Sequence, residues 1–100
     1  MTIFSGLKLR NEKYEEGNQW HHIVGQHEYN LRKFGAESIH NTNNLVEIPK
    51  ELHYKINGYY NSKPLELGGL TVRDWLKTQS FEAQYEYGLD IVQKALNGTL

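Results

Sequence analysis

The sequence predicts an α+β fold in which two short strands are followed by three helices, and three observations support this. Residues 20–24 (W-H-H-I-V) form a compact aromatic and β-branched run, typical of a buried strand. Residues 45–48 alternate apolar and polar side chains. Apolar side chains beyond Pro49 recur at the helical spacings of three and four. A chain of 100 residues predicts one domain, 1–100, with one hydrophobic core.

The segments before and between the two strands are harder to interpret. Leu7 and Leu9 alternate with charged residues, which suggests a further short strand. Residues 25–43 are rich in glycine and asparagine, so we expect a long ordered loop there, with one helical turn anchored by Leu31 and Phe34. Loops of this length in small domains are usually functional.

Helices account for most of the chain after the second strand. Pro49 suits the first position of a helix that runs to about residue 60. His53 lies at the edge of its apolar face, next to Leu52. Thr71 and Ser80 are expected N-caps of two further helices, and Gly98 is expected to end the last one. The apolar face of that last helix is predicted at Phe81, Tyr85, Leu89, Val92 and Leu96. The functional core is therefore expected at about 18–61, and a helical part at about 70–97.

Composition excludes several kinds of chemistry. The chain has no cysteine, which removes disulfides, thiolate zinc sites and cysteine nucleophiles. Its formal net charge of -1 counts against a strongly basic nucleic-acid-binding surface. It has no apolar run long enough to span a membrane. Residues 1–6 lack the features of a signal peptide, so export would have to be arranged by something outside this chain.

Four residues form the candidate site: His21, His22, Asn44 and His53. Adjacent side chains on a strand point to opposite faces, so two neighbouring histidines seldom both enter one core. Both can serve one site where the strand bends or ends. Imidazole is a common ligand of divalent transition metals and the usual general base near neutral pH. A helical histidine such as His53 can close such a site from the other side.

This ordered set resembles the HNH nucleases, and more narrowly the HNH/endonuclease VII type domains of bacterial polymorphic toxins. The matching phrases are H-H-I-V at 21–24, I-H-N-T-N-N-L-V at 39–46, and T-V-R-D-W-L with S-F-E-A-Q-Y-E-Y-G-L within 71–89. Asn44 and His53 are nine residues apart, the spacing usual in that family. The resemblance covers about 20–95 and implies the ββα-metal (His-Me finger) fold, a β-hairpin crossed by one metal-binding helix, with additional C-terminal helices.

The resemblance also implies roles for these residues. His22 would be the general base, and Asn44 would hold the His22 imidazole or its strand in the working orientation. His21 and His53 would bind one divalent metal ion that contacts the scissile phosphate. Many relatives have another ligand four residues further along the helix, where this chain has Asn57. A two-histidine site completed by water is therefore expected, with Mg²⁺ as suitable as Zn²⁺, Ni²⁺ or Mn²⁺.

The function implied is a metal-dependent DNA endonuclease, acting without sequence specificity as a toxin or effector module. It would be delivered into the cytoplasm of a target bacterium as part of a larger toxin, and a cognate immunity protein would neutralise it. Three alternatives stay open: an RNase on the same core, a catalytically inactive metal-binding interaction module and, least favoured, a small helical DNA-binding module.

Several other residues have two interpretations at this point. His40 could either join the site or orient the loop. A basic group could face the phosphates around the site or simply be solvated; its members are Arg32, Lys33, Lys50 and Lys55. His27 is expected to be a solvated loop residue. The larger aromatic side chains are expected in the core rather than on a base-stacking surface, at Trp20, Trp75, Phe81 and Tyr85.

Overall fold

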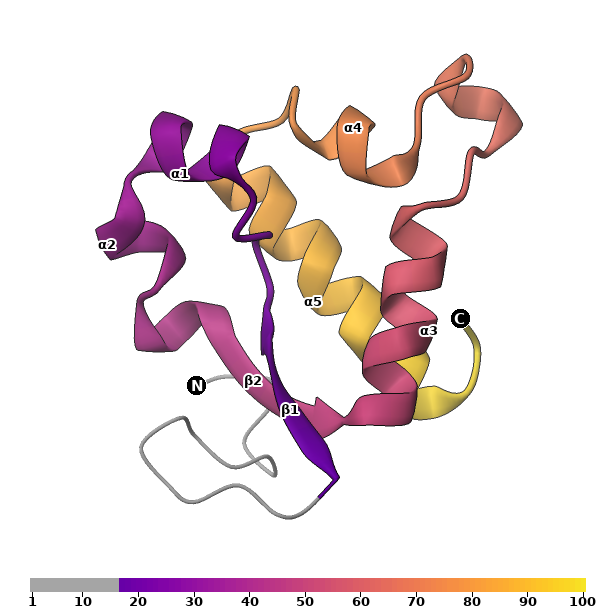
Figure 1. Cartoon of the computed structure of the whole chain (residues 1–100). Helices are drawn as coiled ribbons and strands as arrows, with labels where there is room; N and C mark the ends of the chain where they lie inside the picture. The colour runs from indigo at the N-terminus through magenta and orange to yellow at the C-terminus, as the bar shows by residue number, and fades with distance from the viewer. Residues whose placement is uncertain (1–16) are drawn as a thin grey trace.

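The computed structural model describes residues 17–100, and the strand suggested at Leu7 and Leu9 lies outside this range. It is a mixed α+β structure, as predicted (Figure 1). The two strands are β1 (Asn18–His22) and β2 (Leu45–Pro49). The helices of the described chain are α1 (Glu28–Phe34), α2 (Ala36–Ile39), α3 (Lys50–Tyr60), α4 (Val72–Leu76) and α5 (Phe81–Asn97).

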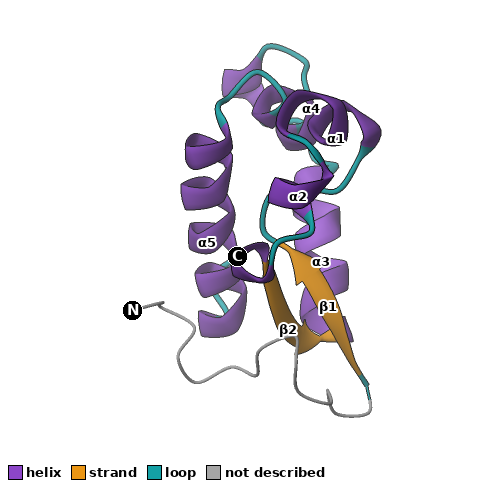
Figure 2. Ribbon diagram, turned by 90° about the vertical axis from the view of Figure 1, so that its left-hand side faces the viewer, coloured by secondary structure: helices purple, strands orange, loops and turns teal. Residues whose placement is uncertain are grey.

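The two strands form an antiparallel pair that packs on α3. Their register places His21 opposite Val46 and Gln19 opposite Ile48. Because side chains alternate along a strand, these four residues share the face that meets α3. In Figure 2 the strand pair overlaps α3, and α5 runs alongside them on the left. The core lies between these layers, with Ile48 and Ile56 fully buried in it.

Helix α5 packs closely against the main chain of Ile23, the residue that follows β1. A Cβ atom added at Gly88 would lie 2.5 Å from the main-chain oxygen of Ile23. Nearby, Asn30 of α1 and Gln84 of α5 exchange hydrogen bonds through their buried side-chain amides, at 2.9 and 3.3 Å. These contacts hold the segment that follows His22 against the long helix.

The helix-end predictions for the C-terminal part are confirmed. The Thr71 hydroxyl accepts from the main-chain N–H of Asp74 at 3.0 Å and so caps α4. The Ser80 hydroxyl accepts from the N–H of Ala83 at 3.1 Å and caps α5. Gly98 ends α5 in the left-handed conformation, with φ of 75°.

The predicted loop at 25–43 is wrong. Helices α1 and α2 and a 3₁₀ turn, Thr42–Asn44, occupy most of this range. The helical turn expected at Leu31 and Phe34 is confirmed, since both residues lie in α1. Several of the glycines and asparagines in this range are helix caps or buried partners, whereas Gly25 lies outside any helix or strand. The Asn41 side chain caps the turn, for example, and Asn30 is fully buried beside Gln84. Solvated amides and buried, paired amides look alike in sequence, so composition misled the prediction.

Three smaller predictions also need correction. The first strand ends at His22, since residues 23–24 form a bend. Pro49 is the last residue of β2 and precedes the first residue of α3. The buried side of α5 runs along Gln84, Gly88, Ile91, Val92 and Ala95, whereas Leu96 is 38% exposed. Because this buried side includes polar and small residues, its sequence resembles that of a solvent-exposed face.

Within residues 17–100, no helix is both long enough and apolar enough to cross a membrane.

Candidate functional site

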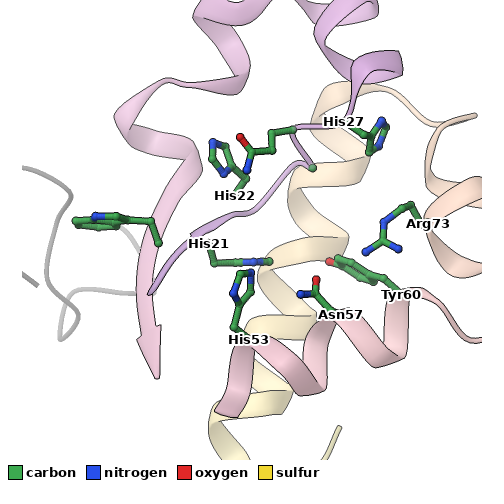
Figure 3. A pocket seen from close by; sticks show the side chains of 10 residues that line it. His21, His22, His27, His53, Asn57, Tyr60 and Arg73 are labelled. Atoms are coloured by element: carbon green, nitrogen blue, oxygen red, sulfur yellow. The ribbon is translucent and has the colours of Figure 1, made fainter. Parts of the chain in front are cut away.

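A pocket of about 360 Å³ opens where β1 ends beside α3 (Figure 3). Its walls come from the end of β1, the turn that follows it, one face of α3 and the start of α4. The lining residues are Trp20, His21, His22, Gly25, Gln26, His27, His53, Asn57, Tyr60 and Arg73. Four of the ten are histidines and none is acidic. The pocket thus combines groups able to exchange protons with a permanent cation.

His21 and His53 face each other inside the pocket. Their ring centroids are 5.3 Å apart, in an edge-to-face arrangement. His21 is 4% exposed, and its Nε2 atom is buried without a hydrogen-bond partner in the described structure. The Nδ1–H of His53 donates to Oε1 of Gln19 at 2.5 Å. That hydrogen bond leaves Nε2 of His53 with a lone pair, the usual arrangement of a metal-binding histidine.

His22 lines the same pocket although it lies on the opposite face of β1 from His21. His22 can still reach the pocket because β1 ends at this residue. Its Nε2 atom is 3.2 Å from Nδ1 of His40, which follows α2. His40 itself is exposed and does not line the pocket. It is therefore a neighbour of His22 rather than a wall of the pocket.

Asn44 lies behind the pocket, with its side chain bonded to main chain. Its Oδ1 accepts from the N–H of Val24 at 2.7 Å, and its Nδ2 donates to the carbonyl oxygens of Val24 at 3.0 Å and Ile39 at 2.8 Å. The amide therefore pairs with both main-chain groups of Val24, as a neighbouring strand would. Of the two roles expected for Asn44, this geometry matches holding the strand end, not the His22 ring.

Burial and neighbouring histidines hold the site imidazoles in their neutral form. Burial, followed by the nearby rings of His53 and His22, lowers the pKa of His21 to about 3. Burial, followed by His40 and His53, lowers the pKa of His22. Burial also lowers the pKa of His53. Neutral imidazole is the form that can accept a proton or bind a metal.

The donor set is small for a metal site. No group of three histidine, cysteine or carboxylate side chains able to hold a metal occurs among residues 17–100. The two-histidine site expected from the sequence needs no such group. The partnerless Nε2 of His21 and the lone pair left on His53 fit a metal ion. Asn57 lies one turn beyond His53 on α3 and lines the same pocket.

The four candidate basic residues do not line the pocket. Arg32 pairs with Glu28 on the surface of α1, and both side chains are at least 75% exposed. Lys33 donates to the carbonyl oxygens of Lys77 and Gln79, so it ties α1 to the segment after α4. Lys50 and Lys55 are exposed residues of α3. The basic group is therefore not one continuous rim.

Sequence reasoning missed six of the ten lining residues, including Trp20, which was expected in the core. Three of the six matter most for the chemistry of the pocket: His27, Tyr60 and Arg73. His27, expected to be a solvated loop residue, caps α1 through its Nδ1 atom and lines the pocket. Arg73 reaches the pocket from α4. Asn57 lies four residues after His53, and Tyr60 lies three residues after Asn57, so the three residues share one face of α3. That spacing was the one available signal, because Arg73 and His27 arrive only through tertiary packing.

No protein-family model matches the chain, and neither the curated proteins nor the solved structures contain a significant match.

Proposed function

We propose that this chain is a metal-dependent nuclease domain of the ββα-metal type that hydrolyses phosphodiester bonds of DNA. The observation that best supports the proposal is the meeting of His21, His22 and His53 in one pocket, from β1 and α3. The hairpin of β1 and β2 is followed directly by α3, an order compatible with such a core. The resemblance of the motifs to HNH nucleases points the same way.

His22 is the proposed general base. If its Nε2–H donates to Nδ1 of His40, its own Nδ1 keeps a lone pair and can take a proton from an attacking water. The lowered pKa of His22 favours the neutral, proton-accepting ring at pH 7. Asn44 is a positioning residue, since it holds the main chain two residues beyond His22.

His21 and His53 are the proposed holders of one divalent metal ion. When bound, such an ion would stabilise negative charge on the scissile phosphate and the leaving oxygen. Imidazole suits Mn²⁺, Ni²⁺ and Zn²⁺, whereas Mg²⁺ would rely mainly on oxygen ligands, so all four ions stay candidates. The amide oxygen of Asn57 and water are the further donors that this face of the pocket offers.

The biological setting proposed is that of a toxin or effector module. The domain would act in the cytoplasm of a target bacterium after delivery within a larger toxin. A cognate immunity protein would bind it and block cleavage. Co-expression with the product of the neighbouring gene should then relieve growth inhibition, and failure to find any neutralising partner there would count against this setting.

Cleavage of supercoiled plasmid tests the proposed activity. Purified protein is assayed with Mg²⁺, Mn²⁺, Ni²⁺, Zn²⁺ or EDTA, beside His22→Ala and the surface control Lys94→Gln. We expect metal-dependent nicking that EDTA abolishes and that His22→Ala reduces at least about 100-fold, the contribution of a general base. RNA is assayed in parallel. Cleavage of RNA alone would replace DNA as the substrate, and metal binding with no cleavage would favour an inactive module.

A further inference from the structure

Tyr60 and Arg73 form a second wall of the pocket, opposite the paired histidines. Tyr60 is 7% exposed, and its hydroxyl is buried with no hydrogen-bond partner in the described structure. Figure 3 shows this hydroxyl directed toward the ring of His21. A buried hydroxyl without a partner is destabilising, so its retention facing a pocket suggests that a ligand supplies the partner.

Arg73 supplies charge beside that hydroxyl. Its guanidinium carbon lies 5.8 Å from the centroid of the Tyr60 ring. One of its Nη1 hydrogens is donated to the neutral Oδ1 of Asn61. The neighbouring Asp74 pairs instead with Lys77 at 3.1 Å, and no carboxylate in the described part of the chain forms an ion pair with Arg73. The guanidinium thus keeps both its charge and further N–H donors available.

At the end of the pocket formed by Tyr60 and Arg73, the lining residues favour an anionic ligand. None of the ten lining residues is acidic, and Arg73 is the permanent cation among them. Arginine binds phosphate oxygens through several N–H groups at once, and a phenol donates well to an anionic oxygen. The two groups come from α3 and α4 and meet at the end of the pocket away from His22.

We propose that Tyr60 and Arg73 form the phosphate-binding wall of this pocket, holding the non-bridging oxygens of a nucleic-acid phosphate in front of His21 and His53. This inference rests on the proposed nuclease function and adds the residues that bind the substrate. The phosphate-binding wall explains how a chain with net charge -1 can hold a polyanion, since the cation lies inside the pocket rather than on a basic surface.

Binding of a dinucleotide without metal tests the phosphate-binding wall directly. The whole chain in EDTA is titrated with the dinucleotide dTpdT and with its uncharged methylphosphonate analogue, followed by NMR chemical shifts. We expect dTpdT to bind about tenfold more tightly than the analogue, the effect of one charge-assisted hydrogen bond. Arg73→Gln should abolish that difference. Tyr60→Phe should weaken the binding of dTpdT about tenfold. Its Tm should be unchanged or raised, because the substitution removes a buried hydroxyl that has no hydrogen-bond partner.

Matched controls separate the wall from general effects. Tyr54→Phe removes an exposed hydroxyl from the same helix, and Lys94→Gln removes a surface charge from α5. Both should bind dTpdT like the unmodified chain. The inference is overturned if Arg73→Gln and Tyr60→Phe also bind normally, or if the unmodified chain does not prefer dTpdT to its analogue. The binding test involves neither metal nor cleavage. A failure to nick plasmid would therefore contradict the proposed nuclease activity without affecting the result for the phosphate-binding wall.

Discussion

The contact between His22 and His40 affects the pKa of His22. Their ring nitrogens are 3.2 Å apart, and His40 contributes, after burial, to lowering the pKa of His22. A general base must be neutral to act, so in the proposed mechanism this neighbour would extend activity toward lower pH. His40, whose role the sequence left open, would act in that mechanism as a positioning residue.

His40→Asn should separate the two effects of His40. The asparagine oxygen can still accept from His22 Nε2–H. The contribution of His40 to lowering the pKa of His22 is lost in this variant, so that pKa should rise. The acid limb of kcat/KM should therefore move to higher pH with the plateau retained, whereas His40→Ala should also lower the plateau. A pH profile of plasmid nicking measures both, and an unmoved acid limb in both variants would contradict the assignment.

Asn44 should matter for stability as much as for activity. Its amide satisfies three main-chain groups of Val24 and Ile39 in a fully buried place. Asn44→Ala leaves those groups without partners, which should cost about 3 kcal/mol or more. Urea unfolding measures this loss. His22→Ala, at a partly exposed residue, should lose activity with little loss of stability; equal stability of the two variants would refute the positioning role of Asn44.

At the scale of elements, α5 determines where the end of β1 lies. Gly88 lets the helix touch the main chain of Ile23, directly after His22. The amide pair of Asn30 and Gln84 holds α1 to the same helix. The C-terminal helices are therefore part of what shapes the pocket, and not only a cover for the core.

Two glycine-to-alanine variants test this contact. A Cβ at Gly88 would lie 2.5 Å from the oxygen of Ile23, so Gly88→Ala should destabilise the fold by about 1–3 kcal/mol and reduce nicking. Gly58, on α3, has open space around it. Gly58→Ala should therefore stabilise the fold by about 0.5–1 kcal/mol through helix propensity. Thermal unfolding of the pair checks both signs, and equal effects would show that the close approach is unimportant.

At the scale of the whole molecule, the histidine cluster links folding to pH. Burial and neighbouring rings lower the pKa of His21 to about 3, and the pKa values of His22 and His53 are lowered as well. The unfolded chain therefore binds more protons than the folded one below pH 6.5. By linkage, stability is complete above that pH and decreases as the pH falls toward 3.

This acid sensitivity should be measurable in EDTA. Between pH 6.5 and 4, His21 alone should remove roughly 3 kcal/mol from the free energy of unfolding. His21→Phe keeps an aromatic ring but does not titrate, so its stability should depend less on pH over that range. Urea midpoints at several pH values compare the two proteins. Identical pH dependence would mean that His21 does not carry this linkage.

The local patterns of this sequence were sufficient for the two strands and α3, apart from their exact ends, and for the caps of α4 and α5. Such features depend on neighbours a few residues away, which periodicity and capping chemistry reveal. The order of His21, His22, Asn44 and His53 predicted one shared site; the three histidines line one pocket, and Asn44 lies behind it.

Only tertiary packing decided which side chains surround that site. Arg73 and Tyr60 join the site because α4 folds back over α3. The glycine- and asparagine-rich segment is helical because Asn30 hydrogen-bonds to Gln84, 54 residues away in the sequence. The inner face of α5 is likewise polar and small where it meets α1 and the end of β1. The physical reason is that a buried amide or a glycine is favourable only when a distant partner or main-chain segment lies against it, and a linear pattern does not contain that partner.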